Sequence, residues 1–329
     1  MKRYILRTIH ARNKDMYTYK YTDPRGKLVK QSIVNQALEG LYIPPALDRV
    51  KINLNKRDKV LAIGYDAKDR AQYTYNKNYT KRQSVQKFHH MIQFGESYQK
   101  ILKKIQQDLY TIDDSKDKQI AMILRFVIEC SIRVGNEKYT IDNQSYGATT
   151  LESRHVKTQG PKIIVDFIGK KGVRNKCTIR NKKLSKEIRT QKRTRNHSEK
   201  LFTYRKGNQY FQVRPSDVNR YLRRFGNFTT KNFRTWGANI ELIYQLQESH
   251  KISDVINSSD KEKKQILNSA IDKVADKLHN TRSVCKSNYL DPKLMDACLY
   301  DTERLFRIFK GCNTKEDYTN AFIKFLKTS

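Results

Sequence analysis

The sequence predicts an α+β protein, with a small β-rich N-terminal domain at residues 1–79 and a larger, mainly α-helical domain at residues 80–329. Short runs in the first part alternate between apolar and polar residues, as half-buried strands do. From Val85 onward, apolar residues recur at steps of three and four, as on one face of a helix. The polar, basic stretch Asn76–Gln83 lies between the two patterns and marks the expected boundary. A chain of 329 residues is long enough for two domains.

Four segments define the expected N-terminal domain. Tyr17–Tyr21 alternates as a strand, and Asp23–Gly26 is a turn sequence. A short helix is expected within Gln31–Gly40, and a second strand at Val60–Tyr65. The domain then closes with an amphipathic β-hairpin, whose second strand ends at Tyr75.

The hairpin strand carries candidate DNA-binding residues. Tyr73 and Tyr75 share one face of the strand because side chains alternate along it. Gln72 has the donor and acceptor needed to pair with a base edge, and Arg70 can reach a phosphate. On spacing alone, an ordinary amphipathic hairpin without a ligand remains the alternative interpretation.

Two helices are expected at the start of the larger domain. The first runs from Val85 to Leu109, and Asp113–Ser115 interrupts the pattern. The second covers Gln119–Ile132 and is apolar nearly all round, which predicts a buried helix. It delivers Arg133 at its end.

A small sheet is expected at about residues 151–180. Ile163, Val165 and Phe167 alternate as in a strand, and a turn follows with Lys170 at its tip. Lys and Arg dominate the segment from Lys170 to Lys206. This segment is a solvated basic surface at minimum, and its charge also suits a track for phosphates.

Helices are again expected toward the C-terminus. A short one covers Val218–Phe225, and another begins near Thr230. Lys231 and Arg234 lie three residues apart, so they share a helical face and can converge on one ligand. The same helix has an apolar stripe formed by Phe233, Trp236, Ile240 and Ile243. We expect Trp236 to pack in the core.

The last hundred residues contain a helix, a catalytic candidate stretch and more helix. Ser259–Glu262 is a capping-box sequence that opens a helix through Leu278. Leu294–Leu326 is again predicted to be helical. Between them lies the stretch from Asn280 to Tyr289, on which the functional interpretation depends.

The composition favours a polyanionic partner. The net charge of +34 suits DNA, RNA or an anionic membrane surface. Membrane binding is the weaker option, because no apolar run approaches the roughly 20 residues that span a bilayer. The N-terminus lacks an apolar signal core, so we expect an intracellular, reducing setting. The five cysteines are scattered without a Cys-x-x-Cys pair, and neither a zinc module nor a disulfide framework is expected.

One ordered set of residues meets the needs of phosphodiester cleavage by a side chain. Two arginines, Arg133 and Arg234, can stabilise the extra negative charge of a pentacoordinate phosphorus. A Lys or His can supply the proton that the departing oxygen needs, and the set contains Lys170 and Lys231. The phenol of Tyr289, of a type with a pKa near 10, suits both attack and later departure. No metal is needed if the arginines supply the positive charge.

Together with Asn280, these residues give the chain a recognisable pattern. The chain resembles type IB DNA topoisomerases, in particular the compact poxvirus and bacterial branch. The resemblance runs nearly end to end and is carried by these segments in order: Tyr42–Ala46, Gly64–Tyr75, Arg133–Tyr139, Asn143–Leu151, Phe167–Lys170, Lys231–Ala238 and Asn280–Tyr289.

The resemblance implies a role for each matched residue. Tyr289 would attack the scissile phosphate and become joined to the 3′ phosphate. Arg133 and Arg234 would stabilise the transition state, with Lys231 assisting in the same pocket. Lys170 would protonate the departing 5′ oxygen. The free 5′ end would then rotate about the intact strand and relax supercoils, without ATP or an essential metal.

The resemblance also implies an architecture and a partner. A β-rich domain and a catalytic domain of the fold shared by type IB topoisomerases and tyrosine recombinases would form a C-shaped clamp around double-stranded DNA. Gln72, Tyr73 and Tyr75 match the strand that docks in the major groove, and Lys138 and Tyr139 match a DNA-contacting loop. The protein would be a monomer without a cofactor or an obligate protein partner. If viral, it would reside in the virion or in the infected-cell cytoplasm.

One departure concerns the position nine residues before the nucleophile. Many relatives have histidine there, whereas this chain has Asn280, with His279 one residue too early. An asparagine still donates a hydrogen bond but does not titrate near neutrality. A second departure is Asn232, where relatives often have an acid.

Two other functions remain open at this point. A tyrosine recombinase or integrase shares the chemistry, but usually presents His-x-x-Arg where this chain has Lys231-x-x-Arg234. A non-enzymatic, basic nucleic-acid-binding protein is the other alternative.

Overall fold

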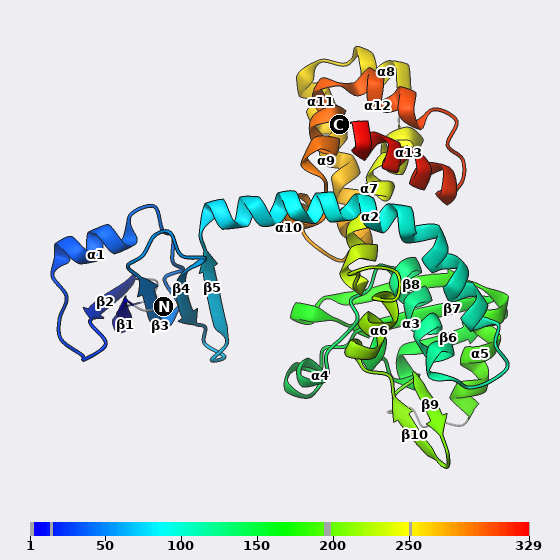
Figure 1. The fold of residues 1–329 in the computed structure, drawn as a ribbon, viewed down its shortest axis with the longest axis horizontal. Helices are drawn as coiled ribbons and strands as arrows, with labels where there is room; N and C mark the ends of the chain where they lie inside the picture. The colour runs from blue at the N-terminus through cyan, green and yellow to red at the C-terminus, as the bar shows by residue number, and fades with distance from the viewer. Residues whose placement is uncertain (1–2, 14–15, 194–198, 250–251, 329) are drawn as a thin grey trace. The chain divides into compact units, whose positions relative to one another are not determined.

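A computed structural model describes residues 3–13, 16–193, 199–249 and 252–328 of the chain. The chain divides into two compact units, Met1–His89 and His90–Ser329 (Figure 1). The first unit is built on a β-sheet and the second is mainly helical, so the expected α+β class is confirmed.

The N-terminal unit contains one antiparallel sheet of five strands in the order β2-β1-β3-β4-β5. The strands are β1 (Tyr4–Asn13), β2 (Met16–Thr22), β3 (Asp48–Asn53), β4 (Val60–Tyr65) and β5 (Ala71–Tyr75). Helix α1 (Gln31–Leu38) follows β2. The strands predicted at Tyr17–Tyr21 and Val60–Tyr65 and the helix at Gln31 are therefore confirmed, whereas β1 and β3 have no counterpart in the sequence interpretation.

A buried arginine explains why β1 is hard to recognise. Arg7 is only 4% exposed and occupies a core-facing position that normally holds an apolar residue. Its guanidinium donates to the carbonyl oxygens of Pro44, at 3.0 Å, and Leu47, at 2.8 Å. It also lies 4.3 Å from the ring centre of Tyr19. These contacts compensate for the buried charge, but the charge breaks the apolar alternation in the sequence.

The two faces of this sheet differ. One face buries an apolar core against α1, formed by Ile5, Val34, Ala37, Ile43, Leu47, Val50, Ile52 and Ala62. On β5, Tyr73 pairs with Ile63 of β4, whereas Gln72 pairs with Gly64. Because side chains alternate along a strand, Gln72 and Tyr73 project to opposite faces. Tyr73 and Tyr75 stack with ring centres 6.1 Å apart, as their shared face predicts.

Helix α2 (Lys77–Leu109) begins earlier than the sequence predicts. The boundary expected between residues 79 and 80 lies in its first turn, and the two compact units divide further along the same helix. Asn76 accepts a hydrogen bond from the backbone N–H of Asn78 at 2.8 Å and so caps the helix. Lys, Arg and Gln are good helix formers, so the polar stretch continues the helix. The side chains of Val85 and Phe88, on which the periodic pattern depends, lie outside the described ones.

The second unit contains the predicted buried helix and small sheet. Helix α3 (Lys116–Cys130) starts at Ser115, whose side chain accepts a hydrogen bond from Lys118 N–H. A short helix follows at α4 (Glu137–Asn143). The sheet has the order β6-β7-β8, formed by β6 (Val156–Gln159), β7 (Lys162–Ile168) and β8 (Arg174–Arg180). Helix α5 (Lys182–Arg193) packs against β6 and β7 (Figure 1).

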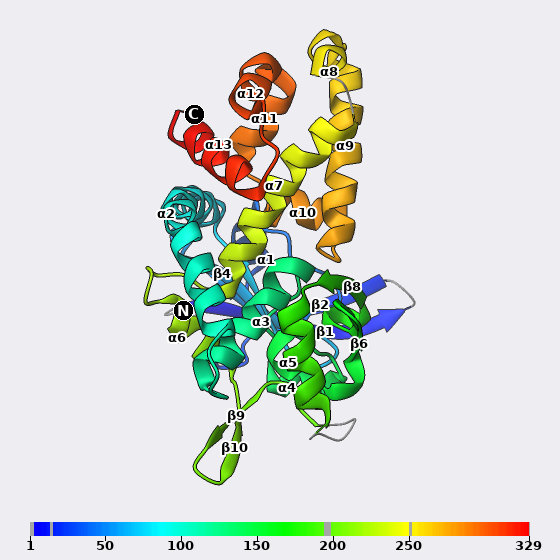
Figure 2. The ribbon, with the colours of Figure 1, turned by 90° about the vertical axis from the view of Figure 1, so that its right-hand side faces the viewer.

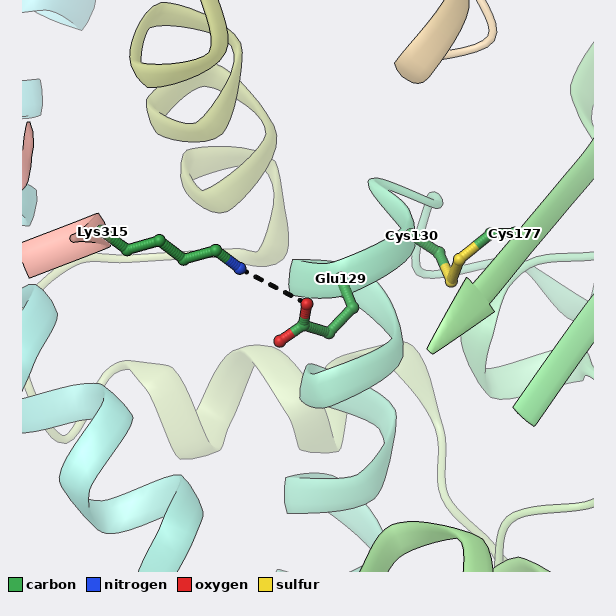
Figure 3. The surroundings of a disulfide bond; sticks show 4 residues. All are labelled: Glu129, Cys130, Cys177 and Lys315. Carbon is green, nitrogen blue, oxygen red and sulfur yellow. Dashed lines mark hydrogen bonds and ion pairs between the residues drawn. A yellow bond between two sulfur atoms is a disulfide. The ribbon is translucent and has the colours of Figure 1, made fainter. Parts of the chain in front are cut away.

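A disulfide joins Cys130, at the end of α3, to Cys177 on β8 (Figure 3). The prediction that the chain has no disulfide is therefore wrong for this pair. The two cysteines are 47 residues apart in sequence, but α3 packs on β8 and brings their Cα atoms to 5.6 Å, within the range that a disulfide requires. Lys315 pairs with Glu129 beside this bond at 3.4 Å. Among the described residues, no group of three or more His, Cys, Asp or Glu is arranged to hold a metal.

Further elements lead to the predicted catalytic helix. A hairpin of β9 (Thr203–Lys206) and β10 (Gln209–Gln212) was not predicted. Helix α6 (Pro215–Leu222) confirms the short helix expected there, and α7 (Thr230–Ser249) begins at the predicted Thr230. Trp236 is 1% exposed, so it belongs to the core as expected. The basic stretch Lys170–Lys206 covers β8, α5 and β9, and its residues 194–198 lie outside the described ones.

The described C-terminal part consists of helices joined by short connections. Helix α8 (Ile252–Asn257) precedes α9 (Asp260–Lys277), which starts with the predicted capping box of Ser259 and Glu262. Helices α7 and α9 lie side by side (Figures 1 and 2). The segment predicted as helical from Leu294 forms three helices: α11 (Pro292–Tyr300), α12 (Thr302–Phe309) and α13 (Lys315–Thr328). None of the helices in the described ranges is both long enough and apolar enough to cross a membrane.

Candidate active site

Four of the six predicted catalytic residues lie together in the second unit. Arg234 donates through Nη2 toward the hydroxyl oxygen of Tyr289 at 3.5 Å. Arg133 donates through Nη2 to Oδ1 of Asn280 at 2.9 Å. The two pairs are joined because Arg234 and Asn280 both donate to the carbonyl oxygen of Leu278, at 3.1 and 3.2 Å. Residues from three distant parts of the sequence therefore form one cluster.

Helix α10 (Arg282–Asn288) sets the distance between Asn280 and Tyr289. Thr281 caps the helix by accepting a hydrogen bond from Val284 N–H, and Asn280 directly precedes this cap. Tyr289 follows the last helical residue, and its N–H donates to the carbonyl oxygen of Cys285 at 3.0 Å. The nine-residue spacing seen in the sequence is thus the length of one short helix with its caps.

Arg234 is held inside the protein with unused hydrogen-bonding capacity. Its side chain projects from α7, and the residue is only 4% exposed. Nε and Nη1 are buried and have no hydrogen-bond partner among the described residues. An arginine has five N–H donors, and leaving buried donors unpaired costs free energy. This arrangement is typical of a site that receives an anion in another state of the protein.

The phenol of Tyr289 is acidified by its surroundings. The residue is 8% exposed, and burial by itself would raise the pKa of the hydroxyl. The positive charges of Arg234, Arg133 and Lys231 outweigh that effect and lower the pKa of Tyr289 below its ordinary value. Arg234 contributes most, through its charge and its hydrogen bond, and its Cζ lies 5.2 Å from the ring centre. A lowered pKa makes the phenolate easier to form.

Close backbone packing positions Arg133. Its carbonyl oxygen accepts a hydrogen bond from Ala148 N–H at 2.8 Å. A Cβ atom on Gly147 would lie 2.5 Å from the backbone of Gly135 and 2.7 Å from the Arg133 oxygen. Gly147 must therefore lack a side chain for the two segments to meet, and Gly135 has the positive φ of +98° that favours glycine. These two glycines therefore support the segment that carries Arg133.

The two lysines are placed differently. Lys231 lies on the first turn of α7, is exposed, and is close enough to the phenol to lower its pKa. Lys170 is exposed in the short 3-10 turn η3 (Lys170–Gly172) between β7 and β8, as predicted. Within the described residues, no contact joins Lys170 to the arginines or to Tyr289. Backbone hydrogen bonds link the region before Lys170 to the segment that holds Arg133. Tyr146 N–H donates to the carbonyl oxygen of Ile168 at 2.9 Å, and Ala148, two residues later, bonds to Arg133.

His279 lies beside the cluster in an unusual backbone conformation. Its φ of +52° is in the left-handed region, which directs the chain from α9 toward Asn280. Burial lowers the pKa of His279, and the neighbouring Arg234 and Arg133 lower it further. The imidazole is therefore neutral at physiological pH, so it adds no positive charge to the site.

Asn239 is a residue that the sequence interpretation did not select. It lies on α7, is fully buried, and donates through Nδ2 to the carbonyl oxygen of Tyr289 at 2.9 Å. Its Oδ1 accepts a hydrogen bond from Asp291 N–H at 2.8 Å. The one available signal was an amide within an otherwise apolar helical stretch, because buried polar side chains need partners.

The candidate DNA-binding residues lie in both units. In the N-terminal unit, Arg70 and Gln72 both bond to Asp66, while Tyr73 and Tyr75 are 52% and 44% exposed. In the second unit, Lys138 and Tyr139 begin α4, where Asn136 caps the helix by accepting from Lys138 N–H at 2.9 Å. Both are exposed, Tyr139 by 51%.

The second unit thus holds a buried phenol beside a buried arginine, with a second arginine and an asparagine in the same cluster. Comparison with known proteins identifies the family of the chain. Residues 76–310 match the family model for the catalytic core of eukaryotic DNA topoisomerase I. A DNA topoisomerase 1B of Acanthamoeba polyphaga mimivirus is 30% identical over 286 residues, which cover 84% of this chain and 82% of the relative.

Two poxvirus proteins are also similar to the chain. DNA topoisomerase 1 of Rabbit fibroma virus (strain Kasza) is 24% identical, over 74% of each chain. DNA topoisomerase 1B of Vaccinia virus (strain Copenhagen) is 22% identical, over 79% of this chain and 81% of the relative. The chain belongs to the type IB DNA topoisomerases, and its resemblance to the compact viral enzymes is confirmed.

Proposed function

We propose that the protein relaxes supercoiled double-stranded DNA through a transient 3′-phosphotyrosine. The observation that carries the proposal is the pairing of Arg234 with Tyr289. A buried guanidinium, two of whose nitrogens have no hydrogen-bond partner among the described residues, lies 3.5 Å from a phenol whose pKa is lowered. A phosphate that enters this cluster satisfies the arginine and meets the nucleophile at once.

Cleavage proceeds by one exchange of ester bonds. The hydroxyl oxygen of Tyr289 gives up its proton to solvent and bonds to phosphorus, while the bond between phosphorus and the 5′ oxygen breaks. Arg133 and Arg234 donate to the non-bridging oxygens, where negative charge accumulates. Asn280, held by Arg133 at 2.9 Å, contributes an amide N–H to the same oxygens.

Lys170 supplies a proton to the departing 5′ oxygen. Because Lys170 is in an exposed turn outside the cluster, DNA binding must bring the turn and the phosphate together. The free 5′ end then rotates about the intact strand and attacks the phosphotyrosine, which restores the backbone. The ester conserves the bond energy, so neither ATP nor an essential metal is needed.

Both units contribute to DNA binding in this proposal. Tyr73, Tyr75, Gln72 and Arg70 would contact the duplex from the N-terminal unit, and Lys138 and Tyr139 from the catalytic unit. The protein acts as a monomer, in the virion or in the cytoplasm of an infected cell.

Plasmid relaxation tests this function against its alternatives. The full chain is incubated with a negatively supercoiled plasmid in the presence of EDTA and without ATP. A topoisomerase of this type relaxes the plasmid to a distribution of topoisomers. A recombinase instead exchanges strands at defined sites, and a non-enzymatic binding protein leaves the linking number unchanged.

A further inference from the structure

One carboxylate organises the β4–β5 hairpin. Oδ1 of Asp66 accepts hydrogen bonds from the backbone N–H groups of Lys68 and Arg70, each at 3.0 Å. Oδ2 accepts from Nε of Arg70 at 2.8 Å and from Nε2 of Gln72 at 3.1 Å. Asp66 therefore holds the turn with one oxygen and two candidate DNA-binding side chains with the other.

The chemistry of Asp66 fixes the orientation of the Gln72 amide. The hydrogen bond from Arg70 is the largest cause that lowers the pKa of Asp66, to about 2, so this side chain is ionised at neutral pH. An ionised carboxylate only accepts hydrogen bonds. Gln72 must therefore turn its nitrogen toward Asp66, which directs Oε1 away from the carboxylate.

Gln72 is also placed to meet a ligand. It is exposed on β5, which lies at one end of the sheet order. Its neighbours in the strand, Tyr73 and Ala71, project to the opposite face. Opposite Gln72 on β4 stands Gly64, which presents no side chain that competes for the amide.

We propose that Asp66 determines base specificity, because it fixes the Gln72 amide so that Oε1 accepts a hydrogen bond from an exocyclic amino group in the major groove. Adenine N6 and cytosine N4 are the groups that donate there. The inference rests on the proposed DNA function and adds the chemical class of base that Gln72 selects on the strand it faces. Arg70, which donates to the same oxygen of Asp66, would contact a phosphate, and a phosphate contact carries no sequence information.

The variant Asp66→Asn changes the orientation of the Gln72 amide while the Gln72 side chain stays in place. Its Oδ1 keeps both backbone hydrogen bonds, so the turn is retained. An amide NH2 group replaces Oδ2 and donates, so the Gln72 amide must rotate and present its own nitrogen outward. The outward group then prefers acceptors, which are guanine N7 and O6 and thymine O4. Asp66→Asn also releases Arg70 and removes a negative charge, and both changes affect binding to all sequences alike.

A binding selection on randomised duplex DNA measures this preference without requiring cleavage. Tyr289→Phe serves as the background, so that complexes stay non-covalent, and bound duplexes are sequenced. We expect one base position to change from adenine or cytosine to guanine or thymine in Asp66→Asn. One hydrogen bond of about 1 kcal/mol corresponds to a change of roughly fivefold in preference.

Two further variants in the same background control the result. Gln72→Leu should remove the preference at that position instead of reversing it. Asp69→Asn is the matched control, because Asp69 lies in the same turn as Asp66. It pairs with Arg49 and has no contact with Gln72 among the described interactions. It removes one negative charge and should leave the base preference unchanged.

The outcomes distinguish the inference from the function on which it rests. An unchanged preference in Asp66→Asn, or an unchanged preference in Gln72→Leu, overturns the specificity role. A reversed preference in binding supports it even if the wild-type protein fails to relax a plasmid, in which case the enzymatic function alone is wrong.

Discussion

Asn239 donates a hydrogen bond to the backbone oxygen of Tyr289 at 2.9 Å, and accepts one from the N–H of Asp291 at 2.8 Å. Helix α7, which carries Arg234, therefore also holds the backbone of Tyr289 and of Asp291, the residues on either side of Leu290. Arginine and phenol keep their spacing because a single helix positions both of them.

Asn239→Ala should slow formation of the covalent adduct while DNA affinity stays nearly constant. Loss of the amide leaves a buried carbonyl and a buried N–H unpaired, which costs about 1–3 kcal/mol of stability. A displacement of Tyr289 by about 1 Å slows attack by up to about 100-fold. Single-turnover cleavage at saturating DNA and equilibrium binding separate the two quantities. A normal cleavage rate in a folded variant would show that Asn239 does not position the tyrosine.

The pH dependence of cleavage should report the lowered pKa of Tyr289. The phenolate is the attacking form, so the rate rises with pH and levels off above the pKa of Tyr289. Because nearby positive charges depress that pKa, the plateau begins at a lower pH than for an ordinary tyrosine. Removing a charge with Lys231→Gln should move the profile to higher pH. Single-turnover rates across pH test this, and an unshifted profile would mean that Lys231 does not act on the phenol.

Lys170→Ala tests the assignment of the general acid. Cleavage of an ordinary phosphodiester should fall by about 100- to 10,000-fold, the usual contribution of general acid catalysis. A substrate with sulfur at the 5′ bridging position should restore the rate, because a thiolate leaves without a proton. Lys171→Ala is the matched control in the same turn and should cleave both substrates normally. Equal defects on the two substrates would exclude proton donation by Lys170.

The disulfide between Cys130 and Cys177 should stabilise the second unit. It closes a loop of 47 residues, for which the loss of chain entropy in the unfolded state gives about 4 kcal/mol. Cys177→Ser should lower the free energy of unfolding by an amount of this order, measured with urea. Reductant should destabilise the wild type and leave Cys177→Ser unchanged, whereas Cys312→Ser, at a free cysteine, should behave as wild type. Insensitivity of the wild type to reductant would show that the bond does not form in solution.

The sequence predicted the residues of the cluster around Tyr289 more completely than the residues that hold this cluster in place. Arg133, Arg234, Asn280 and Tyr289 were predicted because chemistry restricts which residue types can serve and the order of the motifs is specific. No local pattern predicts the role of Asn239, because its side chain contacts the backbone of a residue fifty positions away. The structure brings four of the six predicted catalytic residues together, and the catalytic roles of all six stay predictions.

Tertiary contacts also explain the errors in the fold. No local pattern predicts that Cys130 and Cys177 meet, because their pairing depends on how α3 packs on β8. The apolar alternation does not predict strand β1, because Arg7 occupies a core position. Its charge is stabilised there by hydrogen bonds to the carbonyl groups of Pro44 and Leu47. The start of α2 was misplaced because polarity resembles a linker, although the residues concerned form helix readily.

Covalent adduct formation by Tyr289→Phe tests most directly whether Tyr289 is the nucleophile. The variant lacks one oxygen and should bind duplex DNA with nearly wild-type affinity, yet give no relaxation and no protein–DNA adduct after denaturation. A wild-type yield of adduct from Tyr289→Phe would contradict the account, because another side chain would then be the nucleophile.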